Sequence, residues 1–327
     1  MRIFLAPMEG LVDAPIRETL TAVGGIDRCV TEFIRVTHGL LPPRVFHKYA
    51  PELESGCRTR AGVPVAVQLL GSDPVMMGVH GARAVELGAT QVDINFGCPA
   101  KTVNKHKGGC VLMREPELMQ AITAAVREAV PAAIPVTAKM RLGYDDRSMG
   151  VACAQALADA GAAEIVIHAR SKVDGYRPPA YWEEIARVRD AVKVPVVANG
   201  EIWTVDDYWR CRGRSGCNDV MIGRGLIARP NLAAQIKAAQ RGESLPDMPW
   251  AEVVGLVREY ARALQAHLED RYVTGRIKQW LNYLRIAYVE AEQLWPVARK
   301  FKDVAPMMDC LNSVVQTPEM SVEPVVV

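Results

Sequence analysis

Short apolar runs rich in Val and Ile recur about every 20 to 35 residues along the first 226 residues of the chain. Alanine-rich segments with helical spacing lie between most of these runs, for example at 117–130, 149–160 and 182–192. The pattern therefore predicts a strand followed by a helix, repeated eight times, which is typical of a (β/α)8 TIM barrel. The eight expected strands are Ile3–Met8, Cys29–Ile34, Pro64–Leu70, Gln91–Phe96, Pro135–Leu142, Glu164–Ala169, Val194–Asn199 and Asp219–Gly223.

The apolar runs themselves favour the barrel over the alternative α/β fold, a doubly wound open sheet. Nearly continuous apolar strands are expected where helices cover one side and packed side chains fill the other. Glycine precedes the next strand in three repeats, at Gly88, Gly161 and Gly216, where a helix should end.

Beyond about residue 230 the strand pattern stops and only helical patterns remain. A linker with two prolines, Leu245–Pro249, leads into expected helices at Trp250–Leu268 and Gly275–Ala291, and a further helical stretch runs to about Val315. We therefore expect a barrel domain at 1–244, a small helical domain at 245–316 and a frayed tail at 317–327.

The charge balance excludes both a disordered chain and a uniformly basic coat for nucleic acid. The 327 residues are 50% hydrophobic and 23% charged, and 39 Lys and Arg nearly balance 37 Asp and Glu. A local excess remains at 271–302, where seven basic residues face two acidic ones. Any polyanionic partner should therefore meet a local patch.

We expect a cytoplasmic protein with no membrane partner and no metal. No stretch approaches the roughly 18 apolar residues that a spanning helix needs. The first residues reach Glu9 before a secretory apolar segment could form. The eight cysteines are scattered without a Cys-x-x-Cys pair, which argues against a zinc site or a disulfide framework.

Polar side chains are dense where the apolar runs end, which is where a barrel carries its active site. Glycines follow the last two runs at Gly200 and Gly223, a position that commonly holds phosphate, so we expect a phosphorylated ligand. Two alternatives stay open: simple turn glycines, or the dinucleotide fingerprint G-x-G-x-x-A that Gly223–Ala228 matches.

Three further residues carry possible chemistry at these strand ends. Lys139 could form a Schiff base, stabilise negative charge on a reduced cofactor, or make an ion pair with Glu9 or Glu201. Cys98, between a glycine and a proline, could donate a proton, act as a nucleophile or be inert. His168 could be a core histidine or part of the phosphate site.

The motifs at the strand ends together resemble the tRNA-dihydrouridine synthases, over nearly the whole chain. The matching segments are Leu5–Gly10, Thr31–Phe33, Val67–Leu69, Asp93–Pro99, Lys139–Arg141, Val166–Arg170, Ala198–Glu201 and Met221–Arg224. Three more, Phe33–Arg35, Asp174–Tyr176 and Arg276–Trp280, are most similar to the DusC subfamily, which acts on uridine 16 of the D-loop.

The resemblance implies an FMN-containing barrel followed by a helical tRNA-binding domain. It assigns the flavin ring to Pro7, Met8, Glu9, Gln68 and Lys139, with the lysine ammonium stabilising the anionic reduced flavin. It assigns the ribityl-phosphate end of FMN to His168, Asn199, Gly200, Glu201, Gly223 and Arg224.

The resemblance also implies the reaction and the contacts with tRNA. NADPH, or NADH, would reduce FMN, the flavin would deliver hydride to C6 of uracil, and Cys98 would protonate C5 as general acid. Asn95 and Tyr176 would contact an extruded base or its neighbours. The positions matching tRNA contacts are Arg35, Arg276, Lys278, Tyr283 and Arg299.

Two other functions remain open at this point: a flavin reductase of small pyrimidines or enones, and a tRNA-binding protein with a catalytically silent barrel. We expect a monomer, which suits a wide tRNA surface.

Overall fold

The strands form one closed parallel barrel, as the sequence predicts. The computed structural model describes residues 1–313; the expected tail at 317–327 and the last residues of the expected helical domain lie outside this part. The sheet order is β2-β1-β9-β8-β7-β6-β5-β4-β3, and pairing of β2 with β4 closes it. The strands are β1 Ile3–Leu5, β2 Arg28–Val30, β3 Ile34–Arg35, β4 Val65–Leu70, β5 Val92–Phe96, β6 Val136–Arg141, β7 Ile165–His168, β8 Val196–Asn199 and β9 Val220–Ile222.

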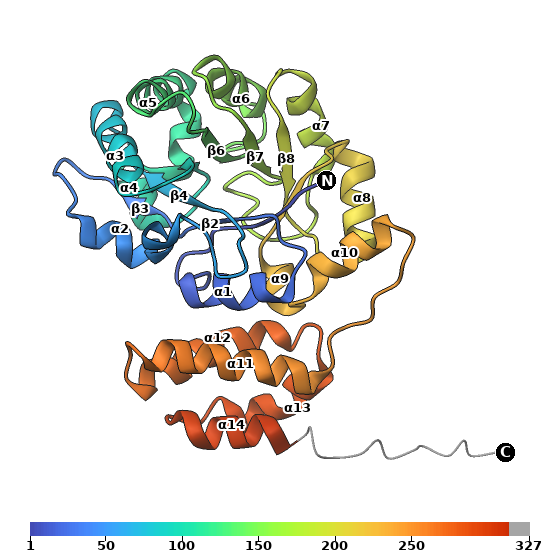
Figure 1. Cartoon of the computed structure of the whole chain (residues 1–327). Helices are drawn as coiled ribbons and strands as arrows, with labels where there is room; N and C mark the ends of the chain where they lie inside the picture. The colour runs from blue at the N-terminus through green and yellow to red at the C-terminus, as the bar shows by residue number, and fades with distance from the viewer. Residues whose placement is uncertain (314–327) are drawn as a thin grey trace. The chain divides into compact units, whose positions relative to one another are not determined.

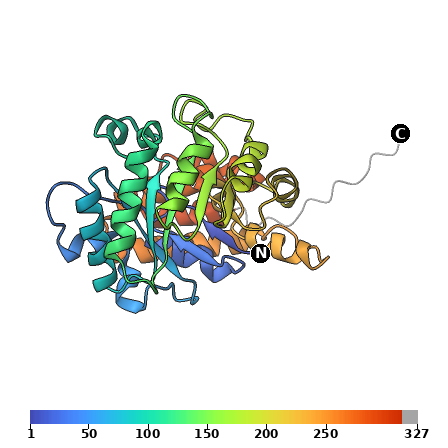
Figure 2. The ribbon, with the colours of Figure 1, turned by 90° about the horizontal axis from the view of Figure 1, so that it is seen from above.

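Helices surround the strands on the outside (Figure 1) and run alongside them (Figure 2). Consecutive helices pack on each other around much of the ring, α3 on α5, α5 on α6, α6 on α7, and α7 on α8. The barrel helices are α1 Ala14–Val23, α2 Pro43–Tyr49, α3 Pro74–Glu86, α4 Lys101–Lys105, α5 Pro116–Ala129, α6 Gly150–Asp159, α7 Trp182–Asp190, α8 Val205–Ser215, α9 Arg224–Ala228 and α10 Leu232–Gln240, with 3-10 turns η1 Pro51–Ser55 and η2 Gly109–Arg114.

The second predicted strand, Cys29–Ile34, is interrupted in the structure. β2 ends at Val30 and β3 begins at Ile34. Between them the side-chain oxygen of Thr31 accepts the backbone N–H of Gln68 at 3.0 Å, so a side chain occupies a position that the backbone ladder would otherwise fill. Both pieces pair with β4, and together they act as the second strand of the eight.

The barrel interior is a packed core with an ionic cluster at the amino ends of the strands. Phe4, Val30, Ala66, Val166, Val197 and Met221 pack together with exposed fractions of 3% or less. Near the strand starts, the Glu164 carboxylate forms ion pairs with Arg2 at 2.6 Å and with Arg28 at 2.8 Å. Both guanidinium groups also lie over the Phe4 ring. This end of the barrel is therefore built for stability, which leaves the opposite end for chemistry.

Helix ends follow the local signals in the sequence. The helix α8 begins with a capping box, in which Thr204 and Asp207 each bond the other's backbone N–H. The three predicted end-of-helix glycines, Gly88, Gly161 and Gly216, have φ of 108°, 89° and 62°, so the prediction is confirmed.

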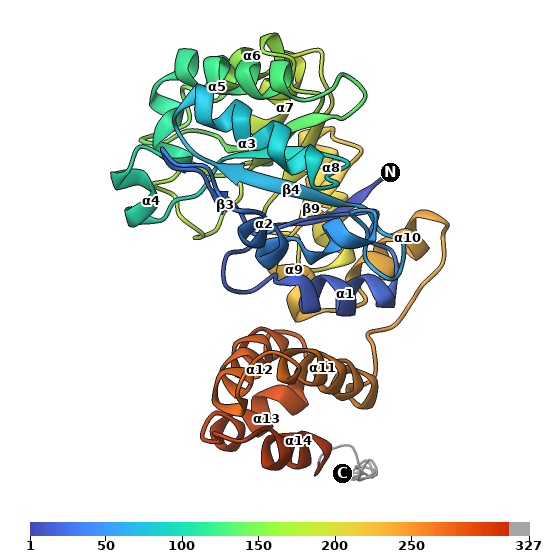
Figure 3. The ribbon, with the colours of Figure 1, turned by 60° about the vertical axis from the view of Figure 1, so that its left-hand side comes forward.

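The chain divides into two compact units. The barrel unit comprises Met1–Leu226 and Leu232–Leu245, and the helical unit comprises Ile227–Asn231 together with the chain from Pro246 onward. The helical unit holds α11 Trp250–Gln265, α12 Asp270–Leu284, α13 Val289–Ala298 and α14 Val304–Ser313, which pack on one another (Figure 3).

The core of the helical unit is organised by aromatic side chains. Trp280 is fully buried, packs edge-on against Tyr260 with ring centroids 5.4 Å apart, and donates from Nε1 to the Ile227 carbonyl at 3.0 Å. The predicted single helix over Gly275–Ala291 is wrong. The chain turns at 285–288 because Tyr288 leaves helical geometry and buries its ring 5.9 Å from that of Trp250. No helix between residues 1 and 313 is long and apolar enough to cross a membrane.

Candidate active site

The parallel barrel brings the expected site residues of its strands and loops to one end. All strands of the barrel are parallel, with β2 and β3 counted as one of the eight. The carboxyl ends of the strands therefore lie at the same end of the barrel, its mouth. Register places Lys139 opposite Asn95, and His168 opposite both Arg141 and Asn199. The residues on or just after the strand ends are Pro7, Met8, Glu9, Arg35, Gln68, Asn95, Cys98, Lys139, His168, Asn199, Gly200, Glu201, Gly223 and Arg224.

A buried hydrogen-bond chain leads from the barrel interior to Cys98. The Asp93 carboxylate accepts from Thr137 Oγ1 at 2.6 Å and from Gln68 Nε2 at 2.7 Å. Asn95 Nδ2 donates to Gln68 Oε1 at 2.8 Å, and Asn95 Oδ1 accepts the backbone N–H of Cys98 at 2.9 Å. Burial raises the pKa of Asp93. These hydrogen bonds connect Asp93 to the backbone that carries the thiol and so help to fix its position.

The loop after Cys98 folds back onto that residue. The Cys98 carbonyl accepts the Cys110 N–H and the Asn104 side-chain amide, each at 3.0 Å. Gly109 has φ +65°, and a Cβ there would lie 3.0 Å from Cys98 Cβ, so glycine permits the close approach. Burial is the main cause that raises the pKa of the Cys98 thiol, which therefore stays protonated at neutral pH. Such a thiol is suited to donate a proton.

Lys139 projects into the barrel mouth and contacts an amide. Its Nζ donates to Asn199 Oδ1 at 3.0 Å, while Asn199 Nδ2 donates to the Met221 carbonyl at 2.8 Å. Burial, followed by the charge of Arg141, lowers the pKa of Lys139 to about 8. Within residues 1–313 the lysine makes no ion pair with Glu9 or Glu201, so that alternative is wrong.

Glu201 joins two guanidinium groups beside the mouth. Its carboxylate accepts from Arg170 Nη2 and lies 3.6 Å from Arg224 Nη2, and it also accepts from Trp203 Nε1 at 2.9 Å. The backbone of Glu201 adopts φ +59°, a conformation that L-residues rarely take. A strained residue that anchors two cations is the pattern expected of a binding site, where surrounding contacts maintain the strain.

Two buried nitrogens near this carboxylate have no hydrogen-bond partner among the described residues: His168 Nδ1 and Arg170 Nη1. Burial lowers the pKa of His168 well below its ordinary value, with Arg141 and Lys139 adding to the effect, so the ring is neutral. A Cβ on Gly200 would lie only 3.3 Å from the His168 ring. The Arg170 Nη1 donor lacks a partner within residues 1–313, and Gly200 leaves space beside the His168 ring, so these groups suit an anionic ligand such as a phosphate.

The two glycines after β9 have different neighbours. A Cβ on Gly223 would meet Met8 Sδ at 3.1 Å. A Cβ on Gly225 would lie 2.0 Å from the Ile202 carbonyl oxygen, so Gly225 is required for backbone packing. The dinucleotide interpretation of Gly223–Ala228 is wrong, because this segment follows the last strand of a closed barrel and does not open a βαβ unit.

The sequence did not reveal the central role of Arg141. Its Nε donates to the Gly97 carbonyl, and its Nη1 donates to the Ser171 and Gly175 carbonyls, each at 3.0 Å. The same guanidinium lies 5.1 Å from the ring centroid of Tyr176, which is 53% exposed. Arg141 thus links the cysteine loop to the loop of Tyr176. Its position at a strand end and its place in the Lys139–Arg141 segment were the signals, but neither gives its partners, because all four lie in distant loops.

The expected tRNA positions of the helical unit differ in their surroundings. Arg276 and Tyr283 are half-buried on α12, and Arg299 is exposed just after α13. The Lys278 ammonium donates to the Phe301 carbonyl, so part of its bonding capacity is used inside the unit. Arg285 pairs with Glu292 at 2.6 Å, which reduces the charge excess counted from the sequence.

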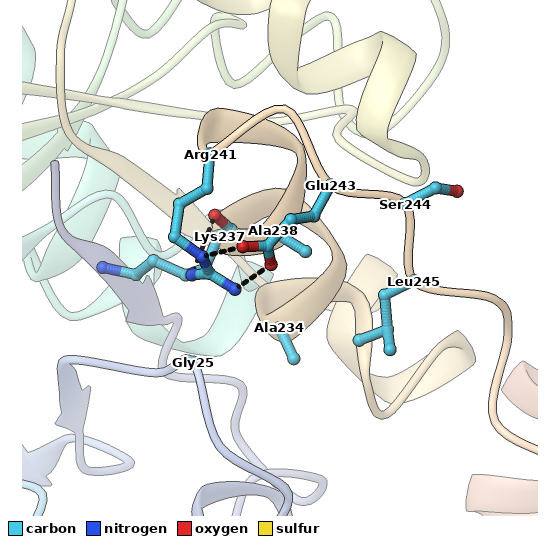
Figure 4. A pocket seen from close by; sticks show the side chains of 8 residues that line it. All are labelled: Gly25, Ala234, Lys237, Ala238, Arg241, Glu243, Ser244 and Leu245. Carbon is cyan, nitrogen blue, oxygen red and sulfur yellow. Dashed lines mark hydrogen bonds and ion pairs between the residues drawn. The ribbon is translucent and has the colours of Figure 1, made fainter.

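A separate cavity of about 420 Å³ lies in the barrel unit along α10 (Figure 4). Its cations are already neutralised: Lys237 Nζ lies 2.8 Å from Asp27, and Arg241 pairs with Glu243 at 2.6 Å. We therefore do not assign an anion site there. Over residues 1–313 no group of three or more His, Cys, Asp or Glu side chains is placed to hold a metal ion.

Comparison with known proteins agrees with this geometry. A tRNA-dihydrouridine(16) synthase of Pseudomonas putida is 57% identical over 98% of this chain and 100% of its own length. A protein of the same name from Pseudomonas syringae pv. tomato is 56% identical over 93% of this chain and 96% of its own. The solved structure of a variant of NCR from Zymomonas mobilis shares the fold, with a TM-score of 0.50 and 16% identity over 76% of this chain and 89% of that one. The dihydrouridine synthase (Dus) family matches residues 4–317, and the chain belongs to that family.

Proposed function

We propose that this protein reduces uridine 16 in the D-loop of tRNA to 5,6-dihydrouridine, with bound FMN and with NADPH as reductant. The observation that carries the proposal is the identity above 50% with relatives named tRNA-dihydrouridine(16) synthase, over nearly the full length of both chains. A tRNA substrate also favours a cytoplasmic location.

The residues at the barrel mouth fit FMN. The unpartnered Arg170 Nη1, together with the His168 ring beside Gly200, supports a site for the phosphate end of the cofactor. Arg224 adds a cation there. The Lys139 ammonium, which bonds Asn199, supports a position against the part of the ring that becomes negative on reduction.

The chain's own groups supply the proton and its placement. A bound flavin, reduced by NADPH, supplies the hydride that C6 of the uracil ring accepts. The Cys98 Sγ–H then donates its proton to C5, so that two hydrogens add across the C5=C6 bond and a thiolate remains, which solvent reprotonates. The raised pKa of Cys98 supports this role, because a thiolate could not donate. Asn95 orients the thiol's backbone.

Contacts with tRNA are proposed on both units. Arg35 is exposed beside the barrel mouth, and Arg276, Lys278, Tyr283 and Arg299 lie on the helical unit. Cationic side chains at these positions suit phosphates, which fix orientation without reading sequence. The target uridine must leave its loop to reach the mouth, and the half-exposed Tyr176 ring offers a surface on which a base can stack.

The test is nucleoside mass spectrometry of an unmodified tRNA transcript after incubation with the protein, FMN and NADPH. We expect a gain of two hydrogens at position 16 alone. A gain elsewhere in the D-loop would contradict the position, and no gain with flavin bound and reducible would contradict the substrate. Parallel reactions with NADH determine which nicotinamide is used.

A further inference from the structure

The loop that follows Cys98 carries a group of cations that the reaction chemistry leaves without a role. Lys101, Lys105, His106 and Lys107 are all exposed, and no acidic residue lies between Asp93 and Glu115. Within residues 1–313, none of the three lysines makes an ion pair or a side-chain hydrogen bond. Lysines with no internal partner are available to an external anion.

The loop holds these cations in a defined place relative to Cys98. Val103 is buried in an apolar cluster with Phe33 and Leu70, and Cys98 packs against the same cluster. Asn104 Nδ2 bonds the carbonyls of Ala100 and Cys98 at 2.7 and 3.0 Å. The buried positions 103 and 104 fix the loop. Lys101 and Lys105, four residues apart, lie on the same face of α4, and the exposed Lys107 follows in the same loop.

Lys107 has an unusual backbone conformation for a lysine. Lys107 has φ +54°, just after α4, where glycine is the residue that adopts this conformation without steric penalty. The chain carries a lysine there and places glycines at the next two positions, 108 and 109. Position 107 therefore carries an exposed charge where glycine would be the less strained residue.

The loop that carries these lysines, residues 101–107, lies near β3, which carries Arg35. A Cβ on Gly108 would lie 3.0 Å from Leu70 Cδ2, and Leu70 is the register partner of Arg35. Figures 1 and 3 both show α4 beside β3. Arg35 also lies near enough to Cys98 for its charge to act on the thiol's pKa. Arg35 and the lysines of the loop that begins at Cys98 therefore belong to the same part of the barrel unit.

We propose that Lys101, Lys105 and Lys107 form a binding site for the phosphodiester backbone of the tRNA loop that delivers the target uridine. This inference rests on the proposed function. The loop would bind the phosphates next to the extruded nucleotide, and because it also holds the Cys98 backbone, phosphate binding would place the base and the thiol together.

The test compares tRNA binding by four forms of the full-length flavoprotein across a salt series. The first is wild type, and the second is the triple variant Lys101→Gln, Lys105→Gln, Lys107→Gln. The third replaces the same lysines by arginine. The matched control is Lys193→Gln, an exposed lysine before the amino end of β8, at the opposite end of the barrel. The probe is an unmodified tRNA transcript.

Each phosphate contact to a flexible strand contributes about 0.7 to the slope of log affinity against log salt. The glutamine triple variant should therefore lower the slope by about 2, which corresponds to about 100-fold weaker binding at 0.1 M salt. The arginine triple variant should retain wild-type affinity. The flavin spectrum and the rate of NADPH oxidation should be the same in all four forms.

An unchanged slope in the glutamine triple variant would overturn the proposal. So would a decrease in slope in Lys193→Gln as large as one third of the decrease in the glutamine triple variant. Nucleoside mass spectrometry of the tRNA from the same samples shows whether dihydrouridine forms. It therefore distinguishes a wrong role for the loop from a wrong proposed function. If wild type forms dihydrouridine and the triple variant binds and reacts equally well, only the role of the loop is refuted.

Discussion

Substitution Cys98→Ala removes the thiol that we propose protonates C5 of uracil. Burial keeps the pKa of this thiol above its ordinary value of 9.0. At about pH 7.5, therefore, fewer than about one thiol in 30 is ionised, and nearly every enzyme molecule carries the proton. A positioned general acid contributes about 10²- to 10⁴-fold to the rate. The single-turnover rate constant should fall by that factor, or about 3 to 5 kcal/mol in the barrier.

The assay mixes pre-reduced enzyme with saturating tRNA and follows reoxidation of the flavin by its absorbance. The Cys98 carbonyl keeps its bonds from Cys110 and Asn104 in the variant, so tRNA affinity and flavin content should not change. Cys310→Ala is the control, because Cys310 is the other cysteine in the described chain that is not fully buried. The ratio of the wild-type rate constant to that of Cys98→Ala isolates the thiol from the titration of Lys139. This ratio should be independent of pH near neutrality and fall tenfold per unit above the thiol's pKa.

Reoxidation of Cys98→Ala at the wild-type rate would refute the assignment of the proton donor. A ratio of wild-type to Cys98→Ala rate constants that already falls between pH 7 and 8 would instead refute the reasoning from burial, because the thiol would then be ionised in that range. A decrease in the Cys310→Ala control would mean that the assay reports thiol loss in general.

Two further predictions follow from the site and from the barrel. Lys139 has a pKa near 8, so its positive charge is present below that pH and lost above it. In wild type, FMN affinity, measured by fluorescence titration, should therefore fall above pH 8. The Lys139→Met variant should bind FMN about 10- to 100-fold more weakly, without this pH dependence. Gly225→Ala places a Cβ 2.0 Å from the Ile202 oxygen and should lower the free energy of unfolding by at least about 1 to 3 kcal/mol, whereas Gly213→Ala, with open space in helix α8, should raise it by about 0.5 to 1. Denaturant titrations measure both changes, and a stable Gly225→Ala protein would show that the backbone there can move.

Periodicity was sufficient to predict the barrel strands because each strand is a nearly uninterrupted apolar run. Strand β4, for example, is buried at all six positions. The break at 31–33 was not predictable, since it depends on a bond between Thr31 and the backbone of Gln68, 37 residues further along the chain. The turn at 285–288 was missed for the same reason: it exists because the Tyr288 ring packs against Trp250.

The candidate site shows the same division between local and distant information. Polar residues at strand ends could be found locally, because a parallel barrel collects them at one mouth. The hydrogen-bond and ion-pair partners of these residues could not be found from local sequence. Arg141 bonds three carbonyls in two loops, and Arg170 pairs with Glu201 across 31 positions. Such contacts are set by how loops of given length close over the barrel, which a single sequence does not specify.

The division of the chain into its two units has a consequence for how this protein can be altered by recombination. The helical unit is built from two separate stretches. The shorter one, Ile227–Asn231, interrupts the barrel unit and comprises the last two residues of α9 and the three residues before α10. It supplies the carbonyl that Trp280 bonds. A crossover after Leu245 would therefore transfer four helices without this segment. Hybrids between relatives should keep their folded state when residues 227–231 come from the same parent as the helices.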